Sequence, residues 1–70
     1  MQQFQLTDEQ EFIELFKLLK AIDWAASGGE AKQMIDAGMV SVNQQVETRK
    51  RNKIKSGDLV SFQEHQVQVI

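Results

Sequence analysis

Five of the eight basic residues in this 70-residue chain fall within residues 49–55, which we call the basic segment. They are Arg49, Lys50, Arg51, Lys53 and Lys55, and no acidic residue lies among them. A guanidinium group can hold two phosphate oxygens and an ammonium group adds a point charge, so these residue types favour contact with a polyanion. Arg49 and Arg51 alternate, and we expect both to project from one face of a strand. Since many charged runs are only solvated surface, that second interpretation also stays open.

A second candidate site for an anion lies at Ser27-Gly28-Gly29-Glu30. The Ser-x-x-Glu spacing predicts a capping box at the start of a helix. Gly28 and Gly29 would leave the free amides of that helix start unobstructed, and Lys32 would add positive charge one turn further on. The alternative is an ordinary helix cap whose glycines serve a tight turn. A phosphate-binding loop of the nucleotide-hydrolase type is excluded, because Gly-Lys-Ser/Thr is absent.

The side chains that catalysis or metal binding would need are few and isolated. The chain has no cysteine, which excludes disulfides and thiolate metal sites. His65 is the only histidine and has no partner that would make a metal site or a catalytic group. The acidic residues between Asp8 and Glu14 look like a solvated helix face. We therefore expect a protein that is not an enzyme and needs no cofactor or metal.

The net charge of −2 is unevenly distributed. Residues 1–30 carry six acidic and two basic side chains, whereas residues 31–55 carry six basic and two acidic ones. A local cluster can attract an anion although the total charge is negative. The length predicts one domain, residues 1–70. Because no signal peptide or membrane span is recognisable, and cysteine is absent, we expect a cytoplasmic protein.

The pattern of apolar residues predicts two helices followed by strands. Phe4 and Leu6 alternate with glutamines, which indicates a short leading strand. A capping box at residues 7–10 and apolar residues at helical spacing predict a helix over residues 8–21. A second helix follows from Ser27 and ends at Gly38, where a left-handed residue can stop it. The short connection between the helices predicts a helical hairpin.

After the second helix the apolar period changes to two. Strands are predicted at 40–42, from Val46, at 59–62 and at 67–69, with turns at 43–44, 56–58 and 64–65. The fold class is therefore α+β, a helical hairpin packed on a small, mostly antiparallel sheet. The four phenylalanines follow core spacing, and we expect them in the core. Trp24 is expected to fill the helical hairpin, although an aromatic ring can also stack on an RNA base.

The order of these residues resembles the S4 RNA-binding domain, a family named after small-subunit ribosomal protein four. The resemblance runs from about residue 14 to residue 70 and is closest to the stand-alone bacterial branch that contains YbcJ-like and YaaA-like proteins. It is carried by Ser27, Glu30, Ala31, Lys32, Ile35, Gly38, Val40, Val42, Asn43, Val46, Gly57 and Asp58.

The resemblance implies a helix-loop-strand surface, the αL motif, that grips structured RNA, often ribosomal or transfer RNA. The positions that carry over are Ser27, Lys32, Asn43 and the basic segment. Glu14-Leu15-Phe16 replaces the family's common Arg-Leu-Asp, and Gly28 replaces a frequent arginine. These departures shift cationic contact onto Lys32 and the basic segment. The usual Asn-Gly turn is Asn43-Gln44, so a residue other than glycine must take a positive φ there.

The sequence thus predicts a monomer that binds structured RNA, with the ribosome or its precursor as a candidate partner. The basic segment would form one wall of the site. Ser27, Gly28, Gly29 and Lys32 would form the other wall, with Asn43 pinning the hairpin between them. The alternative is a protein-interaction module in which an acidic first helix, residues 8–14, docks a basic partner, and the cations only keep a sheet edge soluble.

Overall fold

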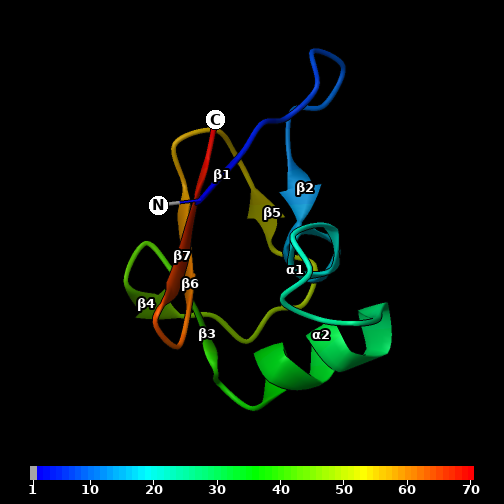
Figure 1. Cartoon of the computed structure of the whole chain (residues 1–70), viewed down its shortest axis with the longest axis vertical. Helices are drawn as coiled ribbons and strands as arrows, with labels where there is room; N and C mark the ends of the chain where they lie inside the picture. The colour runs from blue at the N-terminus through cyan, green and yellow to red at the C-terminus, as the bar shows by residue number, and fades with distance from the viewer. Residues whose placement is uncertain (1) are drawn as a thin grey trace.

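The structure is a computed structural model that describes residues 2–70, and its fold is α+β. Two helices, α1 and α2, lie to one side of a sheet, and two further strands pair beside the helices (Figure 1). The helices are α1 (Leu15–Ala21) and α2 (Gly28–Asp36). The strands are β1 (Gln2–Phe4), β2 (Ile13–Glu14), β3 (Val40–Val42), β4 (Gln45–Val46), β5 (Lys53–Ile54), β6 (Leu59–Phe62) and β7 (His65–Val69).

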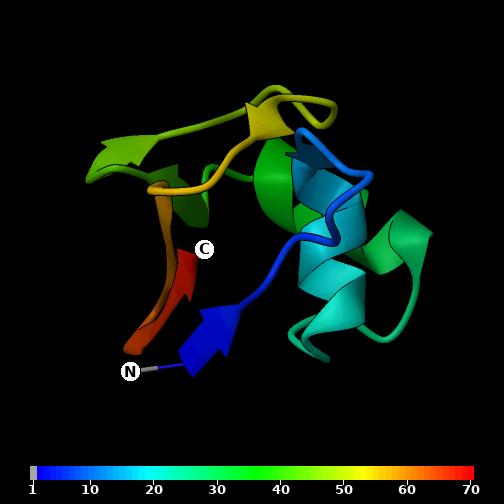
Figure 2. The same cartoon turned by 90° about the horizontal axis from the view of Figure 1, so that it is seen from above.

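The main sheet has five strands in the order β1-β7-β6-β3-β4. Only the β1–β7 pair is parallel, so the sheet is mostly antiparallel, as predicted. β2 and β5 form a separate antiparallel pair in which Ile13 lies opposite Ile54 and Glu14 opposite Lys53. Figure 2 shows the sheet on one side and the helices on the other, with β2 and β5 bridging them. This small ladder therefore brings the basic segment beside the helices.

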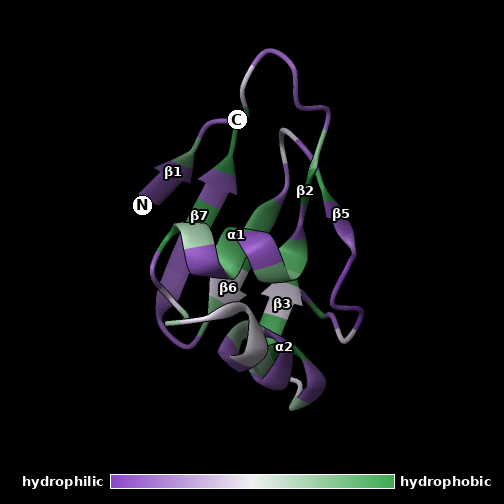
Figure 3. Cartoon of the chain, turned by 90° about the vertical axis from the view of Figure 1, so that its right-hand side faces the viewer, coloured by the Kyte–Doolittle hydropathy of each residue, from purple (hydrophilic) through white to green (hydrophobic). Residues whose placement is uncertain are grey.

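The core lies between the sheet and the helices. Leu15, Leu18 and Leu19 of α1 are fully buried, as are Ile35 of α2 and the inward valines of the sheet. Figure 3 shows apolar residues alternating with hydrophilic ones on α1 and on β7, whereas the segment before β2 is mainly hydrophilic. Ile13 and Ile54 join the same buried cluster. Burial of these two side chains holds the β2–β5 ladder against the core. If the ladder moved away, both side chains would lose their apolar contacts and be exposed to water.

The predicted capping of α2 is confirmed at both ends. The Ser27 hydroxyl accepts a hydrogen bond from the Glu30 amide at 3.1 Å, and the Glu30 carboxylate accepts one from the Ala26 amide at 3.3 Å. At the other end Gly38 has φ +75°, and the amide of Met39 donates to the Met34 carbonyl at 3.1 Å. Gly38 thus closes α2 in the left-handed conformation that glycine adopts without strain.

The predicted first helix was too long. Residues 8–14 are not helical, and α1 begins at Leu15. The Thr7 amide does donate to the Gln10 side chain at 3.1 Å. The Gln10 amide, however, donates to the Thr7 carbonyl, which closes an isolated turn. The chain then enters β2, because Ile13 gains a strand partner in Ile54. The acidic side chains of Asp8, Glu9 and Glu11 are exposed ahead of this strand.

The remaining strands and turns agree closely with the predicted pattern. β1 ends at Phe4, whereas the leading strand was placed around Phe4 and Leu6. Asn43 (φ 51°) and Gln44 (φ 70°) both take the positive φ that a type I′ hairpin turn requires, which confirms the expected left-handed Gln44. The last hairpin turns at 63–64 instead of 64–65, with Gln63 at φ 56° and His65 already in β7.

The aromatic residues are less buried than predicted. Phe4, Phe16 and Phe62 are partly buried against the core, and Phe12 is exposed, so its assignment to the core was wrong. Trp24 lies in the connection between the helices and packs on the last hairpin as well. Its ring centroid is 6.2 Å from that of Phe62 and 5.9 Å from that of His65.

Within residues 2–70, no helix has the length and apolar character required to cross a bilayer. The same residues contain no group of three or more His, Asp or Glu side chains placed to hold a metal ion.

Two glycine substitutions test the account of α2. Gly38→Ala should lower the free energy of unfolding by about 1 kcal/mol, because alanine is strained at positive φ. A methyl group there would meet Val46 Cγ1 at 3.7 Å, so steric conflict adds nothing. Gly29→Ala is the matched control. Its Cβ would meet only the Ser27 Oγ at 3.9 Å, and helix propensity should raise stability by up to about 1 kcal/mol. Urea unfolding of both variants measures the difference, and equal losses would contradict the account.

Candidate nucleic-acid interface

The basic segment begins as a loop that is tied to the first turn of α1. The amides of Leu15 and Phe16 donate to the carbonyls of Asn52 and Lys50, at 2.9 and 3.1 Å. Glu14, the residue preceding α1, offers no side-chain cap, so the loop carbonyls satisfy helix amides that would otherwise lack partners. Regular strand structure is limited to Lys53–Ile54. The expectation that Arg49 and Arg51 share a strand face was therefore wrong, because both lie in the loop ahead of β5.

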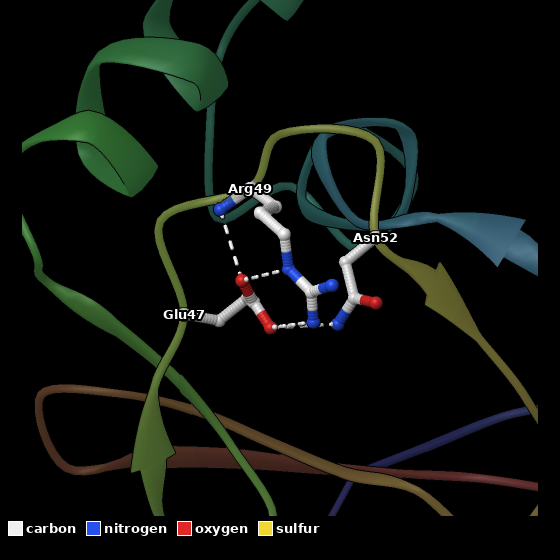
Figure 4. A network of polar contacts seen from close by, with 3 residues as sticks. All are labelled: Glu47, Arg49 and Asn52. Atoms are coloured by element: carbon white, nitrogen blue, oxygen red, sulfur yellow. Dashed lines mark hydrogen bonds and ion pairs between the residues drawn. The ribbon is translucent and has the colours of Figure 1, made fainter.

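Glu47 organises the start of this loop (Figure 4). One carboxylate oxygen accepts hydrogen bonds from the amide and the Nε of Arg49, both at 2.9 Å. The other oxygen accepts from Arg49 Nη2 and from the Asn52 side chain, each at 3.0 Å. The hydrogen bond from the Arg49 side chain is the main cause that lowers the pKa of Glu47 below 4.5. Glu47 is therefore a fixed anion at neutral pH that folds the loop back on itself.

Two further cations of the loop also have acidic partners from other elements. Lys50 Nζ lies 3.2 Å from a carboxylate oxygen of Asp36, the last residue of α2. Arg51 lies 3.6 Å from Glu14, whose carboxylate also pairs with Lys17 at 3.0 Å. The arginine side chain is 73% exposed, so its ion pair is weak and can exchange for another anion.

Phe16 joins the loop to the start of α2. Lys32 Nζ lies 4.7 Å from the centroid of the Phe16 ring and Arg51 Cζ lies 5.8 Å from it, so the two cations meet around one aromatic ring. A Cβ at Gly28 would lie 3.8 Å from the same ring. The two walls expected from the sequence, the basic segment and the α2 start, thus lie against a shared side chain.

An open hollow of about 490 Å³ lies on the surface of the basic segment. It is lined by Arg49, Arg51, Asn52, Lys53 and Lys55. Neither Lys53 nor Lys55 has an ion pair within residues 2–70, and Lys53 Nζ lies 5.1 Å from the centroid of the Phe12 ring. Four cations around one recess make a region where anionic groups are attracted.

At the α2 start, Ser27 is committed to the helix cap, while Gly28 and Gly29 occupy its first turn. No heavy atom lies closer than 3.8 Å to a Cβ placed at either glycine. The backbone there is also free of positive φ, so the fold does not demand glycine at either position. The Phe16 ring therefore lies beside Gly28, and the space around Gly29 is bordered only by the Ser27 hydroxyl.

Asn43 is used inside the fold. Its side chain donates to Asp58 at 3.0 Å and accepts from the Leu59 amide at 2.9 Å, which pins the β3–β4 turn to the start of β6. Asp58 also accepts from the Lys55 amide at 2.8 Å and so fixes the end of the basic segment. Asn43 thus acts on the candidate interface through Asp58, and its contact with RNA stays a prediction.

The geometry adds four residues that the sequence did not single out: Phe12, Phe16, Glu47 and Asn52. Glu47 precedes Arg49 by two residues in the sequence, and a turn can bring residues at that spacing together, so this partner had a local signal. The aromatic residues gave no separate signal, because their helical spacing looked like core. Their role depends on the pairing of β2 with β5, which links segments about 40 residues apart in the chain.

Known proteins are similar to this chain in both sequence and fold. Over 58 residues, 83% of either chain, it is 52% identical to a protein of Escherichia coli (strain K12) named "Putative RNA-binding protein YbcJ". The same identity and coverage relate it to an "Uncharacterized protein YbcJ" of Shigella flexneri.

The solution structure of YbcJ from E. coli matches the fold with a TM-score of 0.76 at 47% sequence identity, covering 100% of this chain and 87% of that one. That structure is described as revealing an "ALFAL motif involved in RNA-binding". The expected fold is thus confirmed by a solved relative. Residues 4–70, nearly the whole chain, match the family model described as the S4 domain. The chain therefore belongs to the S4 domain family.

Proposed function

We propose that residues 1–70 form one RNA-binding domain that holds structured RNA by phosphate contacts and does not catalyse a reaction. The observation that carries the proposal is the hollow lined by Arg49, Arg51, Lys53 and Lys55, with Lys32 nearby across the Phe16 ring. Such contacts set the position of a protein on a nucleic acid before any base is recognised. The S4 family and the relative named as RNA-binding support the same assignment.

The balance of charge at the candidate interface favours a polyanion. The basic segment and Lys32 supply six cations, while the carboxylates paired with them are Glu14, Asp36 and Glu47. The Lys50–Asp36 pair joins two exposed side chains and contributes little net stability, so a phosphate can replace Asp36 at small cost, whereas Glu47 is largely buried and stays bonded to Arg49. Lys53 and Lys55 need no such exchange. The interface therefore has an excess of positive charge, although the whole chain has a net charge of −2.

The loop is ordered before any ligand arrives. Glu47 binds the Arg49 side chain and backbone, and α1 holds the carbonyls of Lys50 and Asn52. Fixing a loop in advance reduces the entropy that binding must remove. A surface of fixed shape suits a folded RNA, whose grooves and bends present phosphates in a defined arrangement. We propose ribosomal or transfer RNA as the target class, with the ribosome or its precursor as partner, bound by a cytoplasmic monomer.

The alternative function, docking of a basic protein on an acidic first helix, loses its structural basis. The helix that it required does not form over residues 8–14. Glu14, moreover, pairs with Lys17 and Arg51 of the same chain.

Removal of the two unpaired lysines tests the proposal. The Lys53→Ala/Lys55→Ala variant should fold normally, because neither side chain has an ion pair within residues 2–70. It should bind a structured RNA more weakly. Each lost phosphate contact should flatten the log-log dependence of affinity on salt by up to about 0.9, with the value for B-DNA as guide. Fluorescence anisotropy over a series of salt concentrations measures both quantities.

Lys20→Ala is the matched control, since this exposed lysine lies in the last turn of α1, away from the loop. It should leave both affinity and salt slope close to those of the parent. Unchanged binding by the double variant would refute the proposed surface. If the parent binds no structured RNA, the proposed function itself is wrong.

Acidification tests the ordering of the loop by Glu47. Because the pKa of Glu47 is lowered in the folded chain, chiefly by the Arg49 hydrogen bond, its stabilising contribution is present above about pH 4.5 and is lost as the pH falls through the folded pKa. The Nε–H resonance of Arg49 should therefore move to its free position in an NMR titration that extends below that pKa. Glu47→Gln should abolish the step. If the chemical shift of this resonance does not change during the titration, the Glu47–Arg49 pair does not hold the loop.

A further inference from the structure

Phe12 occupies a position that the core does not explain. The other three phenylalanines are partly buried against the core, whereas Phe12 is 37% exposed. Its neighbour Ile13 is the residue that enters the core, opposite Ile54. Phe12 directly precedes β2, and successive side chains of an extended chain point to opposite faces, so its ring faces away from the core that Ile13 enters. An aromatic ring is thus presented to solvent directly beside the candidate interface.

The register of the ladder places this ring among the unpaired lysines. Ile13 lies opposite Ile54 and Glu14 opposite Lys53, so Phe12 falls opposite Lys55 when the antiparallel register is continued by one residue. Lys53 Nζ lies 5.1 Å from the centroid of the Phe12 ring. Both lysines also line the hollow. Within residues 2–70, one aromatic ring and two cations that have no ion pair thus lie on the side of the ladder that also carries Glu14, whose partners are Lys17 and Arg51.

We propose that Phe12 stacks on an unpaired base of the RNA while Lys53 and Lys55 contact the phosphates beside that base. This inference rests on the proposed function and makes it more specific. Every base has a π-face that an aromatic ring can cover, and a groove that combines such rings with cations is typical of binding to unpaired nucleotides. The substrate class is then a structured RNA with a bulged or looped-out nucleotide, in preference to an uninterrupted duplex.

The contact between Lys53 and Phe12 in the free protein is compatible with this role. A cation–π contact at an exposed site is weaker than the stacking of a base on an aromatic ring. A base can therefore take the place of the ammonium group on the ring. The lysine side chain is long and flexible, so it can turn toward a phosphate at the same time.

The test compares two RNA hairpins that are identical except for one bulged nucleotide in the stem. Phe12→Leu keeps an apolar side chain of similar size but removes the π-face. The parent should prefer the bulged hairpin. Phe12→Leu should bind that hairpin more weakly, by up to about 150-fold, the upper limit for replacing a stacking ring by alanine, and should bind the uninterrupted hairpin as the parent does.

Salt dependence separates stacking from charge. Phe12→Leu removes no cation, so its log-log salt slope on the bulged hairpin should equal that of the parent. Lys53→Ala removes a phosphate contact and should flatten the slope on that RNA. An independent readout is the Phe12→Trp/Trp24→Phe variant, in which the only indole lies at position 12. Its fluorescence should be quenched by the bulged hairpin and much less by the uninterrupted one.

Three outcomes would overturn the inference. If Phe12→Leu binds the bulged hairpin as tightly as the parent, Phe12 does not stack on a base, and the proposed function stands without it. If Phe12→Leu weakens both hairpins equally and melts at a lower temperature, the ring has only a structural role. If the parent binds neither hairpin, both the proposed function and the inference are wrong.

Discussion

The candidate interface depends on two backbone hydrogen bonds, from the amides of Leu15 and Phe16 to the carbonyls of Asn52 and Lys50. The amides at the start of a helix need partners from outside it, and here Glu14 supplies none through its side chain. The loop of the basic segment provides them. The same two bonds therefore complete α1 and hold a positively charged loop in place, so a change that shifts the start of α1 also shifts the interface.

Charge and packing cooperate around this constraint. Glu47 folds Arg49 and Asn52 into the loop, and Asp36 holds Lys50 beside α2. Phe16 then fills the space between the loop and Lys32. The carboxylates do not cancel the positive surface, because they are fewer than the cations and because Lys53 and Lys55 have no ion pair within residues 2–70. A small protein with a net negative charge can in this way keep one ordered cationic surface.

The sequence predicted those features that depend on neighbouring residues. The Ser27–Glu30 cap, the left-handed Gly38 and the Asn43–Gln44 turn each follow from local backbone chemistry and are confirmed. The prediction of a helix over residues 8–14 was wrong because Ile13 pairs in a strand with Ile54, a residue distant in the sequence. The exposure of Phe12 and the loop around Arg49 and Arg51 follow from that same long-range pairing, which no local pattern reveals. The sequence correctly located the basic segment as a cluster of positive charge. Its acidic partners other than Glu47 could not be predicted, because they come from α2 and from the end of β2.

The central claim is that one surface, formed by residues 47–55, the α2 start and Phe12, contacts structured RNA. The most direct measurement is a titration of the ¹⁵N-labelled chain with a bulged RNA hairpin, followed residue by residue by NMR. The account predicts that chemical shifts change mainly at residues 12–16, 28–32 and 47–55, with little change in β1 and in the hairpin of β6 and β7. Changes centred on β1 or on the acidic turn at residues 8–11, with the basic segment unaffected, would contradict it.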